Sequence, residues 1–331
     1  MHKYFLSFVF IFSLSFLNAE SISVMTINAQ NLFDTIDDPG KDDKAYLPIE
    51  MKQSDEHKSL CNKIRVNRWK NECLFQDWNN ETKAAKLNNL LEVIVAYDSD
   101  GADIIGLQEV ENINILNQLF DLLEPYGYID FILQEGSDNR GIDTAFISKY
   151  EISNPKLHYV EFSAEYETID TRPILEVDIS INNKLLKFYN SHFPSNYHPV
   201  QMRIQSFNKL KELVSRHSKP AVALGDFNLT NKDDKKFEVF KGQEDFWYVA
   251  HREGCEACLG TYYYNRGKSW DFLDTIMASR DRGIHFDKDS IEVFINELNS
   301  YKNTGKPHWF NPETKLGVTD HFPMVAKIKI Y

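Results

Sequence analysis

Six apolar segments of this chain carry polar side chains at or near one end, where an interior strand would not ordinarily bury them. These residues are Asn28, Gln108, Glu109, Asn190, His192, Asp226, Asn228, Asp274, Asp320 and His321. A single polar residue of this kind is explained by a turn or a cap. Burying a carboxylate is costly, however, unless it is paired, hydrogen-bonded or bound to metal. The recurrence therefore predicts one polar cluster at the mouth of the sheets, where α/β proteins bind ligands.

Segments typical of strands alternate with longer segments typical of helices in both halves of the chain. Strands are predicted at 21–29, 102–110, 143–149, 173–180, 185–192, 219–228, 269–279 and 323–330. Helices are predicted at 82–97, 112–125 and 199–217, and the first places Leu87, Leu90, Leu91 and Ile94 on one face. This order predicts an α/β domain whose sheets are covered by helices. No shift in composition marks a second domain.

The strand predicted at 219–228 ends in "LGDFN" and carries both Asp226 and Asn228. Residues i and i+2 of a strand share a face and lie about 7 Å apart. We therefore expect the two side chains to point at one place. Gly225 has no side chain, so neighbours or substrate can approach the backbone closely.

Residues 1–19 have the features of a secretory signal peptide. Lys3 precedes an apolar run from Phe5 to Leu17, and Ala19 provides a small residue for cleavage. The run is shorter than the ~20 residues of a comfortable membrane span. The alternative is an uncleaved N-terminal anchor. We expect residues 20–331 to form a soluble, exported domain in the periplasm or outside the cell.

The chain has four cysteines, Cys61, Cys73, Cys255 and Cys258. An even number in an exported chain favours disulfides. Three pairings are possible, and we favour Cys61–Cys73 and Cys255–Cys258 because both close short loops. A zinc site is disfavoured by the wide spacing of the first pair. A thioredoxin-like role for "CEAC" needs a helix after it, whereas "LGTYYY" is typical of a strand.

The segment at about 37–81 differs from its surroundings because it is polar, irregular in pattern and contains two cysteines. So long a segment within a domain is usually functional or an elaborated loop. Within it, "HKSLCNKIRVNRWK" (57–70) has five Lys or Arg and no acid, in a chain of net charge -12. It could follow a nucleic-acid backbone and stack a base on Trp69. Equally, it could be a solvated loop held by a disulfide.

The composition of the polar cluster narrows the chemistry. Carboxylate and amide oxygens suit Mg²⁺ or Mn²⁺, which also keep water and substrate phosphate as ligands. The chain lacks an HExxH zinc motif, a GxSxG nucleophile motif and a Walker-type phosphate loop. The net charge disfavours wrapping nucleic acid by bulk electrostatics, but not an enzyme that uses metal ions and a few local cations.

Six short motifs, in chain order, resemble those of the endonuclease/exonuclease/phosphatase superfamily. They are "TINAQN", "GLQEV", "NSHFPS", "LGDFN", "SWDFLD" and "TDHFP". This superfamily includes secreted deoxyribonucleases, abasic-site endonucleases, sphingomyelinases and inositol-polyphosphate phosphatases. The resemblance covers nearly the whole mature chain. It implies a four-layer α/β fold, a two-sheet sandwich with helices on the outer faces, and one metal-dependent phosphoesterase site.

The resemblance also implies a metal site. Glu109 corresponds to the principal metal ligand, Asp320 to a metal-side carboxylate, and Asn28 to a supporting contact near metal and phosphate. The implied cofactor is Mg²⁺, with Mn²⁺ as the alternative. Some members carry a carboxylate two residues after the first Asn. Gln30 stands there in this chain, which weakens the implication of a second metal site.

The implied catalytic residues come from four of the motifs. Asp226 corresponds to the group that orients or deprotonates the attacking water, and Asn228 to a group that holds the phosphate or that water. His321, oriented by Asp274, corresponds to a phosphate contact or proton-transfer group. His192 resembles the second histidine of the secreted deoxyribonucleases, a candidate general acid. These groups supply the aimed water and the proton that phosphodiester cleavage needs.

Two further residues, Arg172 and Asn190, are expected to bind substrate phosphate. Their alternative role is to satisfy backbone groups beside a sheet. In "RGIDTAF", Arg140 and Asp143 form either a structural ion pair or part of the site.

We therefore expect a secreted, Mg²⁺-dependent phosphodiesterase, a nuclease acting on DNA or RNA, and a monomer without stable membrane insertion. The enzymatic alternatives are a phospholipid phosphodiesterase of the sphingomyelinase type and a phosphomonoesterase. An alternative of another class is a catalytically inactive binding protein. The intact set of Glu109, Asp226, Asn228, Asp320 and His321 argues against it.

Overall fold

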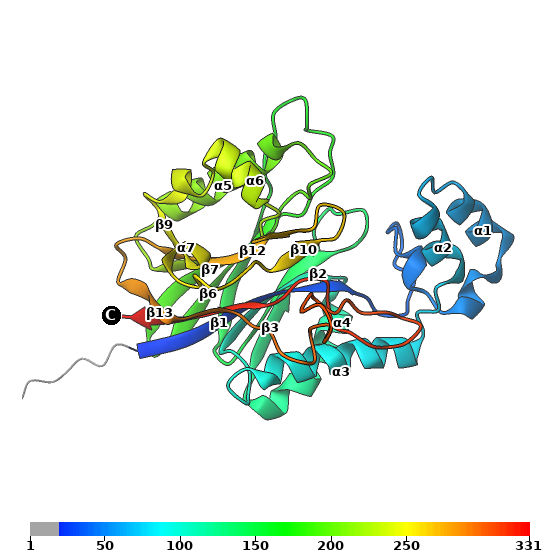
Figure 1. The fold of residues 1–331 in the computed structure, drawn as a ribbon, viewed down its shortest axis with the longest axis horizontal. Helices are drawn as coiled ribbons and strands as arrows, with labels where there is room; N and C mark the ends of the chain where they lie inside the picture. The colour runs from blue at the N-terminus through cyan, green and yellow to red at the C-terminus, as the bar shows by residue number, and fades with distance from the viewer. Residues whose placement is uncertain (1–19) are drawn as a thin grey trace, which may run out of the picture.

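The computed structural model describes residues 20–331 and consists of two six-stranded sheets packed face to face (Figure 1). The first sheet has the order β13-β14-β1-β2-β4-β3, with β1 (Glu20–Leu32), β2 (Ile104–Val110), β3 (Asp130–Leu133), β4 (Asp143–Ser148), β13 (Ile284–Val293) and β14 (Met324–Ile330). The second has the order β5-β6-β7-β8-β12-β9, with β5 (Ile152–His158), β6 (Ile174–Ile181), β7 (Lys184–His192), β8 (Ala221–Asp226), β9 (Trp247–Val249) and β12 (Asp274–Ser279). A separate hairpin pairs β10 (Tyr262–Tyr264) with β11 (Ser269–Asp271). The predicted signal peptide, residues 1–19, lies outside the described residues.

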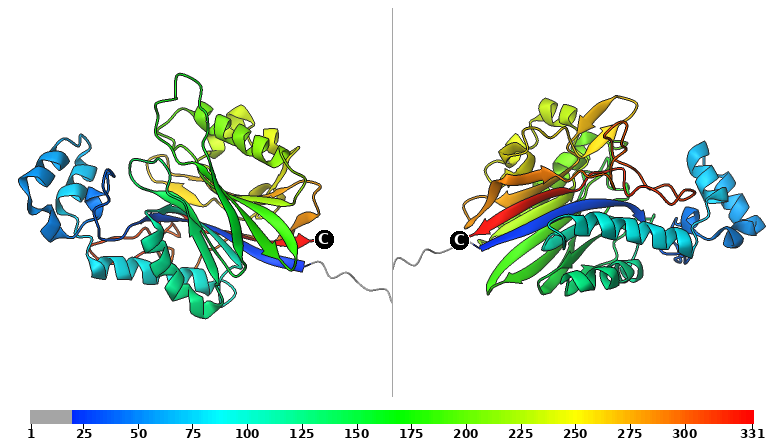
Figure 2. Two further views of the ribbon diagram at one scale, coloured as in Figure 1. Left: turned by 180° about the vertical axis from the view of Figure 1, so that it is seen from behind. Right: turned by 60° about the horizontal axis from the view of Figure 1, so that its bottom comes forward.

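Helices cover the outer faces of both sheets. They are α3 (Asn80–Ala96), α4 (Ile113–Leu123), α5 (Val200–Ser215), α6 (Asn231–Phe237) and α7 (Ala250–Glu253), with 3₁₀ turns η3 (Glu124–Tyr126) and η4 (Lys241–Gln243). Leu90 of α3 and Leu119 of α4 belong to the same buried cluster as Ile105 of β2. Leu210 of α5 is buried in a cluster with Ala223 of β8. Figure 2 shows these helices outside the paired sheets. The predicted four-layer α/β fold is confirmed.

The helix boundaries have local causes. The side chain of Asn79 accepts hydrogen bonds from the backbone N–H groups of Glu81 and Thr82, which caps α3. Asn112 caps α4 in the same way. That helix ends at Leu123 and passes into the 3₁₀ turn η3, because Pro125 has no backbone N–H to continue the α-helical hydrogen bonds.

Two buried amides, those of Asn190 and Gln108, form a polar bridge within the core between the sheets. Asn190 is 0% exposed. Its Nδ2 donates to the carbonyl oxygens of Leu107 at 2.9 Å and Ala145 at 2.7 Å in the opposite sheet. Its Oδ1 accepts from Gln108 Nε2 at 2.7 Å. A Cβ on Gly106 would lie 3.2 Å from this amide, so glycine leaves room for the bridge.

The segment at 37–81 was expected to be irregular, but its polar residues form two short helices. These are α1 (Asp55–Asn62) and α2 (Asn67–Phe75), preceded by the 3₁₀ turns η1 (Lys44–Tyr46) and η2 (Ile49–Gln53). We call residues 55–75 the α1–α2 lobe, which projects from one end of the sandwich (Figures 1 and 2). The predicted disulfide Cys61–Cys73 joins its helices, with Cα atoms 5.6 Å apart. The predicted Cys255–Cys258 disulfide is also present.

A buried lysine holds the α1–α2 lobe to the preceding turns. Lys52 Nζ donates to the carbonyl oxygens of Ala45 at 2.9 Å, Glu72 at 3.2 Å and Gln76 at 2.6 Å. Burial lowers the pKa of Lys52 to about 8. Because carbonyl groups at the end of a helix lack intrahelical partners, this ammonium group stabilises the end of α2.

Two predicted strands differ from the structure. The segment 269–279 divides into β11 and β12, so Asp274 begins a strand rather than lying inside one. The strand predicted at 219–228 ends at Asp226. Within residues 20–331, no helix has the length and apolar character needed to cross a membrane.

Candidate active site

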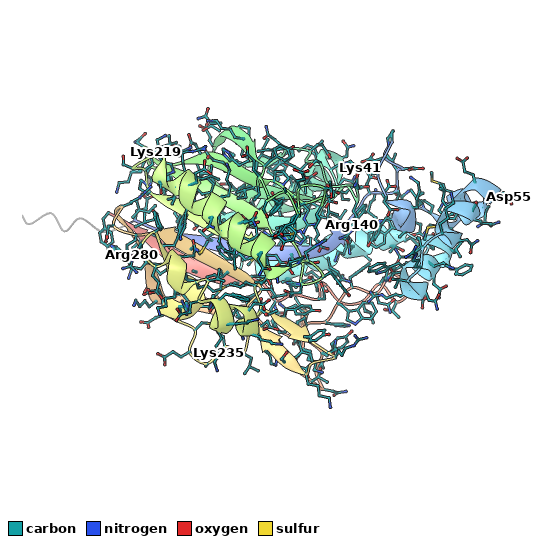
Figure 3. The ribbon with its side chains drawn as sticks, turned by 90° about the horizontal axis from the view of Figure 1, so that it is seen from above. Lys41, Asp55, Arg140, Lys219, Lys235 and Arg280 are labelled. Carbon is teal, nitrogen blue, oxygen red and sulfur yellow. A yellow bond between two sulfur atoms is a disulfide. The ribbon has the colours of Figure 1, made fainter. Side chains whose placement is uncertain are left out.

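The topology brings the predicted polar residues to one edge of the sandwich. β1 runs parallel to β2, and β7 runs parallel to β8, so all four end at the same edge. β12 and β14 run antiparallel to β8 and β1 and begin at that edge. In the second sheet, Asp226 is the register partner of both His192 and Asp274. Figure 3 views this region with its side chains, and Arg140 is labelled in it.

Glu109 lies in an irregular part of β2. Its φ is 62°, in the left-handed region that a glutamate rarely adopts, where the pairing of β2 with β4 shifts register. Its Oε2 accepts from the backbone N–H of Asn31 at 3.0 Å, and its Oε1 lies 3.4 Å from Asn28 Nδ2. Strained backbone of this kind is concentrated at functional sites, because the surrounding contacts must hold it in place.

Asn28 links the two sheets within the site. Its Nδ2 also donates to Asp226 Oδ2 at 3.2 Å. The backbone carbonyl oxygen of Asn28 accepts from Thr319 Oγ1 at 2.7 Å, which fixes the start of the "TDHFP" turn. These bonds bring Glu109, Asp226 and the Asp320 segment together around one amide.

The sequence led us to expect Asp226 and Asn228 on one strand face, but the structure does not place them so. β8 ends at Asp226, and Asn228 has a φ of 51° in the turn that follows. The backbone N–H of Asn228 donates to Asp226 Oδ1 at 2.9 Å, and Asn228 Nδ2 donates to Phe193 O at 3.1 Å. The pair therefore forms an Asx-type turn. A Cβ on Gly225 would lie 2.0 Å from Ser191 O, so glycine permits β7 and β8 to approach here.

His321 and Asp274 form a buried pair. His321 Nδ1 lies 2.7 Å from Asp274 Oδ2, which also accepts from Thr261 Oγ1 at 2.7 Å. Burial alone would lower the pKa of His321. The charge and hydrogen bond of Asp274, joined by the charge of Asp226, instead raise it well above its usual 6.5. His321 is therefore a cation at neutral pH, oriented by Asp274 as predicted.

His192 has the opposite electrostatic environment. Its Nε2 lies 3.7 Å from Asp226 Oδ2 and 3.9 Å from Glu109 Oε1. Burial first, and then the positive charges of Arg172 and Arg140, lower the pKa of His192 well below its usual 6.5. A neutral imidazole at pH 7 is a poor proton donor, which disagrees with the expectation that His192 is the general acid.

The pKa of Asp226 lies close to neutral pH. Burial, followed by the charge of Asp274, raises its pKa to about 7, although His321 acts in the opposite direction. A carboxylate with this pKa can accept a proton from water at physiological pH. Ligand atoms of Asp226, Asp274 and His321 lie within 4.8 Å of one another, as in a metal site. His321 is protonated and engaged with Asp274, however, so this trio suits proton transfer better.

A divalent cation fits a neighbouring set of oxygen atoms. Burial, and then the charge of Glu109, raise the pKa of Asp320 against the pull of His321. A cation beside the buried Asp320 carboxylate would stabilise its charged form. Asn28 Oδ1 accepts one bond, from Gln30 N at 2.9 Å, and has a second lone pair. These oxygen donors suit Mg²⁺ or Mn²⁺ rather than zinc.

Arg172 and Asn190 both donate hydrogen bonds to the protein itself, although Arg172 lies close enough to His192 for its charge to act on that histidine, so its phosphate contact stays a prediction. Arg172 donates to Asp138 Oδ2 at 3.2 Å and to Phe193 O at 3.1 Å. Asn190 is the inter-sheet bridge described above. Both therefore satisfy groups of the protein itself, the alternative that the sequence left open.

The structure brings two further residues to the site, and for one of them, Arg140, the sequence left a structural ion pair and a site role open. Arg140 does not pair with Asp143, whose Oδ1 accepts from Gly136 N at 2.9 Å. It donates instead to Asn31 Oδ1, beside Glu109. Although burial lowers the pKa of Arg140, the charge of Glu109 contributes to raising it. Arg140 is therefore a cation at the rim of the site. The sequence signal that pointed to it was the motif "RGID" at 140–143.

The second residue is Tyr262, whose ring lies 4.9 Å from that of His321. Burial, and then the charge of Asp320, raise its pKa to about 12, so it remains a phenol. Nothing in "LGTYYY" distinguishes it from its neighbours. Its position depends on an isolated bridge between Tyr262 and His321, which is a long-range contact.

The comparisons agree with this fold. The model of the Endonuclease/Exonuclease/phosphatase family matches residues 67–330, and the chain belongs to that family. Members of the family are divalent-metal-dependent phosphoesterases. A comparison with curated protein sequences gave no significant match.

Solved structures with this fold cover nearly the whole chain. A family protein from Bacteroides thetaiotaomicron is 16% identical, with a TM-score of 0.57 over 95% of this chain and 99% of that one. A mannosyl-6-phosphatase of the same organism is 16% identical, with a TM-score of 0.57 over 93% and 99%. Truncated TDP2 of Caenorhabditis elegans is 14% identical, with a TM-score of 0.54 over 93% and 97%. At these identities the similarity establishes the fold alone.

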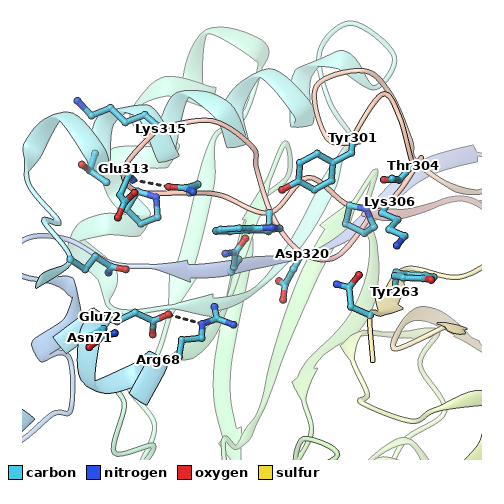
Figure 4. Close-up of a pocket in the computed structure, with 18 of the residues that line it drawn as sticks. Arg68, Asn71, Glu72, Tyr263, Tyr301, Thr304, Lys306, Glu313, Lys315 and Asp320 are labelled. Atoms are coloured by element: carbon cyan, nitrogen blue, oxygen red, sulfur yellow. Dashed lines mark hydrogen bonds and ion pairs between the residues drawn. The ribbon is translucent and has the colours of Figure 1, made fainter. Parts of the chain in front are cut away.

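A large groove leads away from the site. Its volume is about 1540 Å³, and Asp320, Gln30 and Tyr262 line its inner end. Figure 4 shows Arg68 and Glu72 of α2 on one side, with Tyr301 and Lys306 on another. Pockets that enclose a drug-sized ligand are roughly 300–1,000 Å³. The groove is therefore large enough for an extended substrate.

Proposed function

We propose that this protein is an exported, Mg²⁺-dependent phosphodiesterase that hydrolyses nucleic acid. The observation that carries the proposal is a large groove that reaches Asp320 and Tyr262, the neighbours of His321 in the Asp226–Asp274–His321 trio. A pocket for a small phosphomonoester would need no such space. Two disulfides and the apolar N-terminal run support export.

The proposed metal site consists of Glu109, Asp320 and Asn28. A divalent cation bound there would neutralise charge on the phosphoryl oxygens. Arg140 would add a second positive charge at the rim, close to Glu109. An arginine can donate two parallel hydrogen bonds to a phosphate group, which also fixes the orientation of that group.

The chain's own groups account for proton transfer. Asp226, with its pKa of about 7, aims the attacking water and accepts its proton as the water oxygen bonds to phosphorus. The protonated His321 then donates a proton to the leaving oxygen as the P–O bond breaks. His192 is neutral and lies near Asp226, where it positions the water or a phosphate oxygen by hydrogen bonding. This division of roles replaces the expectation that His192 is the acid.

The test is a substrate panel with and without EDTA, comparing wild type with Asp226→Ala. The panel contains plasmid DNA, RNA, sphingomyelin, a phosphorylated inositol and mannose 6-phosphate. We expect wild type to cleave DNA or RNA, EDTA to abolish cleavage, and the variant to be inactive. Hydrolysis of a lipid or a monoester without nucleic acid would contradict the nuclease assignment. Cleavage of none of them, with metal present, would support an inactive binding protein.

A further inference from the structure

The groove has two walls that come from opposite ends of the sequence. One is α2 of the α1–α2 lobe, which contributes Arg68, Asn71 and Phe75. The other is the segment between β13 and β14, residues 295–317, which we call the groove loop; it contributes Tyr301, Lys306 and Trp309 among others. Both walls meet the catalytic edge of the sandwich, where Asp320 lies (Figure 4).

The α1–α2 lobe has five Lys or Arg and three acids, a net charge of +2 in an acidic protein. Its stretch 57–70 has five Lys or Arg and no acid, whereas the chain has a net charge of -12. Arg68 pairs with Glu72 at 2.8 Å. Among residues 20–331, the other four, Lys58, Lys63, Arg65 and Lys70, have no salt bridge. A loop that needed only to be solvated would gain nothing from such a concentration of unpaired cations, but a polyanion would be attracted to it.

Aromatic rings on both walls are exposed without an apolar partner to cover them. Phe75 is 68% exposed on α2 and Trp309 is 40% exposed on the groove loop, and both line the groove. Lys306 Nζ lies 3.8 Å from the centre of the Tyr263 ring, so a cation and a ring are presented together. Rings beside unpaired cations are the arrangement by which proteins bind single-stranded nucleic acid, the rings stacking bases and the cations contacting phosphates.

The groove loop is held in place rather than free. Gln30 Nε2 donates to Phe310 O at 3.3 Å, and Gln30 Oε1 accepts from Phe310 N at 2.8 Å. His308 N donates to Asn299 O at 2.8 Å within the loop. Gln30 occupies the position where some family members have a carboxylate. In this chain its amide attaches the groove loop to the end of β1.

From these contacts we infer that the groove between α2 and the groove loop binds several nucleotides of a single strand on one side of the scissile phosphate. This inference rests on the proposed nuclease activity and extends it to substrate selection. The bases stack on Trp309 and on the Lys306–Tyr263 pair, and Arg68, Lys302 and Lys306, which line the groove, contact the backbone. A duplex keeps its bases stacked on one another, so it cannot use the rings, and single strands are the preferred substrate.

The test compares Trp309→Ala with wild type on three substrates: bis-p-nitrophenyl phosphate, single-stranded DNA of 4 to ~20 nucleotides, and a duplex of the same sequence. Stacking loss at one ring should lower kcat/KM on the long single strand at least about fivefold. The small diester lacks nucleotides for the groove, so its hydrolysis should change less than about twofold. Tyr331→Ala is the matched control, because Tyr331 is an exposed aromatic beyond the far end of β14.

Each outcome separates the inference from the activity on which it rests. If wild type hydrolyses neither the single-stranded DNA nor the duplex, the proposed nuclease function fails. If wild type hydrolyses single strands but Trp309→Ala is equally active on the long ones, the inference about the groove is wrong. A preference for duplex, or no increase of kcat/KM with strand length, also overturns it. Tyr263→Ala provides a second variant if Trp309→Ala does not fold, as judged by circular dichroism.

Discussion

His321 Nδ1 and Asp274 Oδ2 lie 2.7 Å apart in a buried, hydrogen-bonded pair that joins the two sheets of the sandwich. Asp274 begins β12 of the second sheet, and His321 lies in the turn that leads into β14 of the first, which begins at Met324. The pair therefore depends on correct packing of the sheets. It also sets the charge of the group that we assign to leaving-group protonation.

Replacing Asp274 by Asn should lower kcat without changing substrate binding. An amide keeps the shape but removes the negative charge that raises the pKa of His321. We expect kcat to fall about 10²-fold or more, because general-acid catalysis typically contributes 10²–10⁴-fold. Steady-state kinetics on an oligonucleotide will measure this. A parallel rise in KM with unchanged kcat would instead assign Asp274 to substrate binding.

Replacing Asn190 by Ala should destabilise the fold rather than affect the chemistry. It would leave the carbonyl oxygens of Leu107 and Ala145 without their inter-sheet donor. We expect a loss of about 2–4 kcal/mol in the free energy of unfolding, since each unsatisfied buried group costs about 1–3 kcal/mol. Urea denaturation will measure it, with Asn117→Ala on the exposed face of α4 as control. Unchanged stability with reduced phosphate binding would restore the substrate-contact role.

Glu176 should make stability fall at acid pH. It accepts from His158 Nε2 at 2.9 Å and from Lys187 Nζ at 2.5 Å. Burial opposes ionisation, but these two bonds lower the pKa of Glu176 from 4.5 to about 2. The stabilisation is complete above pH 4.5 and is lost as the pH falls towards 2. Urea denaturation between pH 7 and pH 2 should show a shallower decline for Glu176→Gln; an identical decline would refute the assignment.

Replacing Glu109 by Gln should weaken metal binding. The amide keeps the length of the side chain and its left-handed backbone site, but removes one negative charge from the proposed ligand set. We expect the Kd for Mg²⁺ or Mn²⁺ to rise at least about tenfold, the lower end of the effect of removing even indirect ligand support. Calorimetric titration will measure it without a substrate. Glu212→Gln on the surface of α5 should leave the Kd unchanged, and equal affinity in both variants would exclude Glu109 as a ligand.

The strand ends were predictable because burial makes polar residues conspicuous there. Asn28, Glu109, Asp226 and His321 interrupt apolar segments, and parallel pairing of β1 with β2 and β7 with β8 brings such ends to one edge. The alternation of strands and helices predicted sheets covered by helices, and the family resemblance implied the four-layer order. Both disulfides were also predicted, since each closes a short loop.

Residues whose role depends on long-range packing were not predictable. Asn190 looks like another strand-end polar group, yet its side chain enters the core because Gly106 leaves room opposite. Asn228 leaves the strand face because its backbone turns at a positive φ. His192 differs in charge from His321 through neighbours far away in sequence, Arg172 and Arg140 among them. The polar pattern of the α1–α2 lobe concealed two helices whose buried contacts are few.

The central claim is that Asp226 activates water at a phosphodiester while a divalent metal is bound beside it. Single-turnover cleavage of an end-labelled single-stranded oligonucleotide by wild type and Asp226→Asn, across a Mg²⁺ titration, tests it most directly. We predict that wild type cleaves only with metal. The variant should bind the same oligonucleotide and metal but cleave about 10³-fold more slowly. Metal-independent cleavage by wild type, or an Asp226→Asn variant that cleaves at the wild-type rate, would contradict the account.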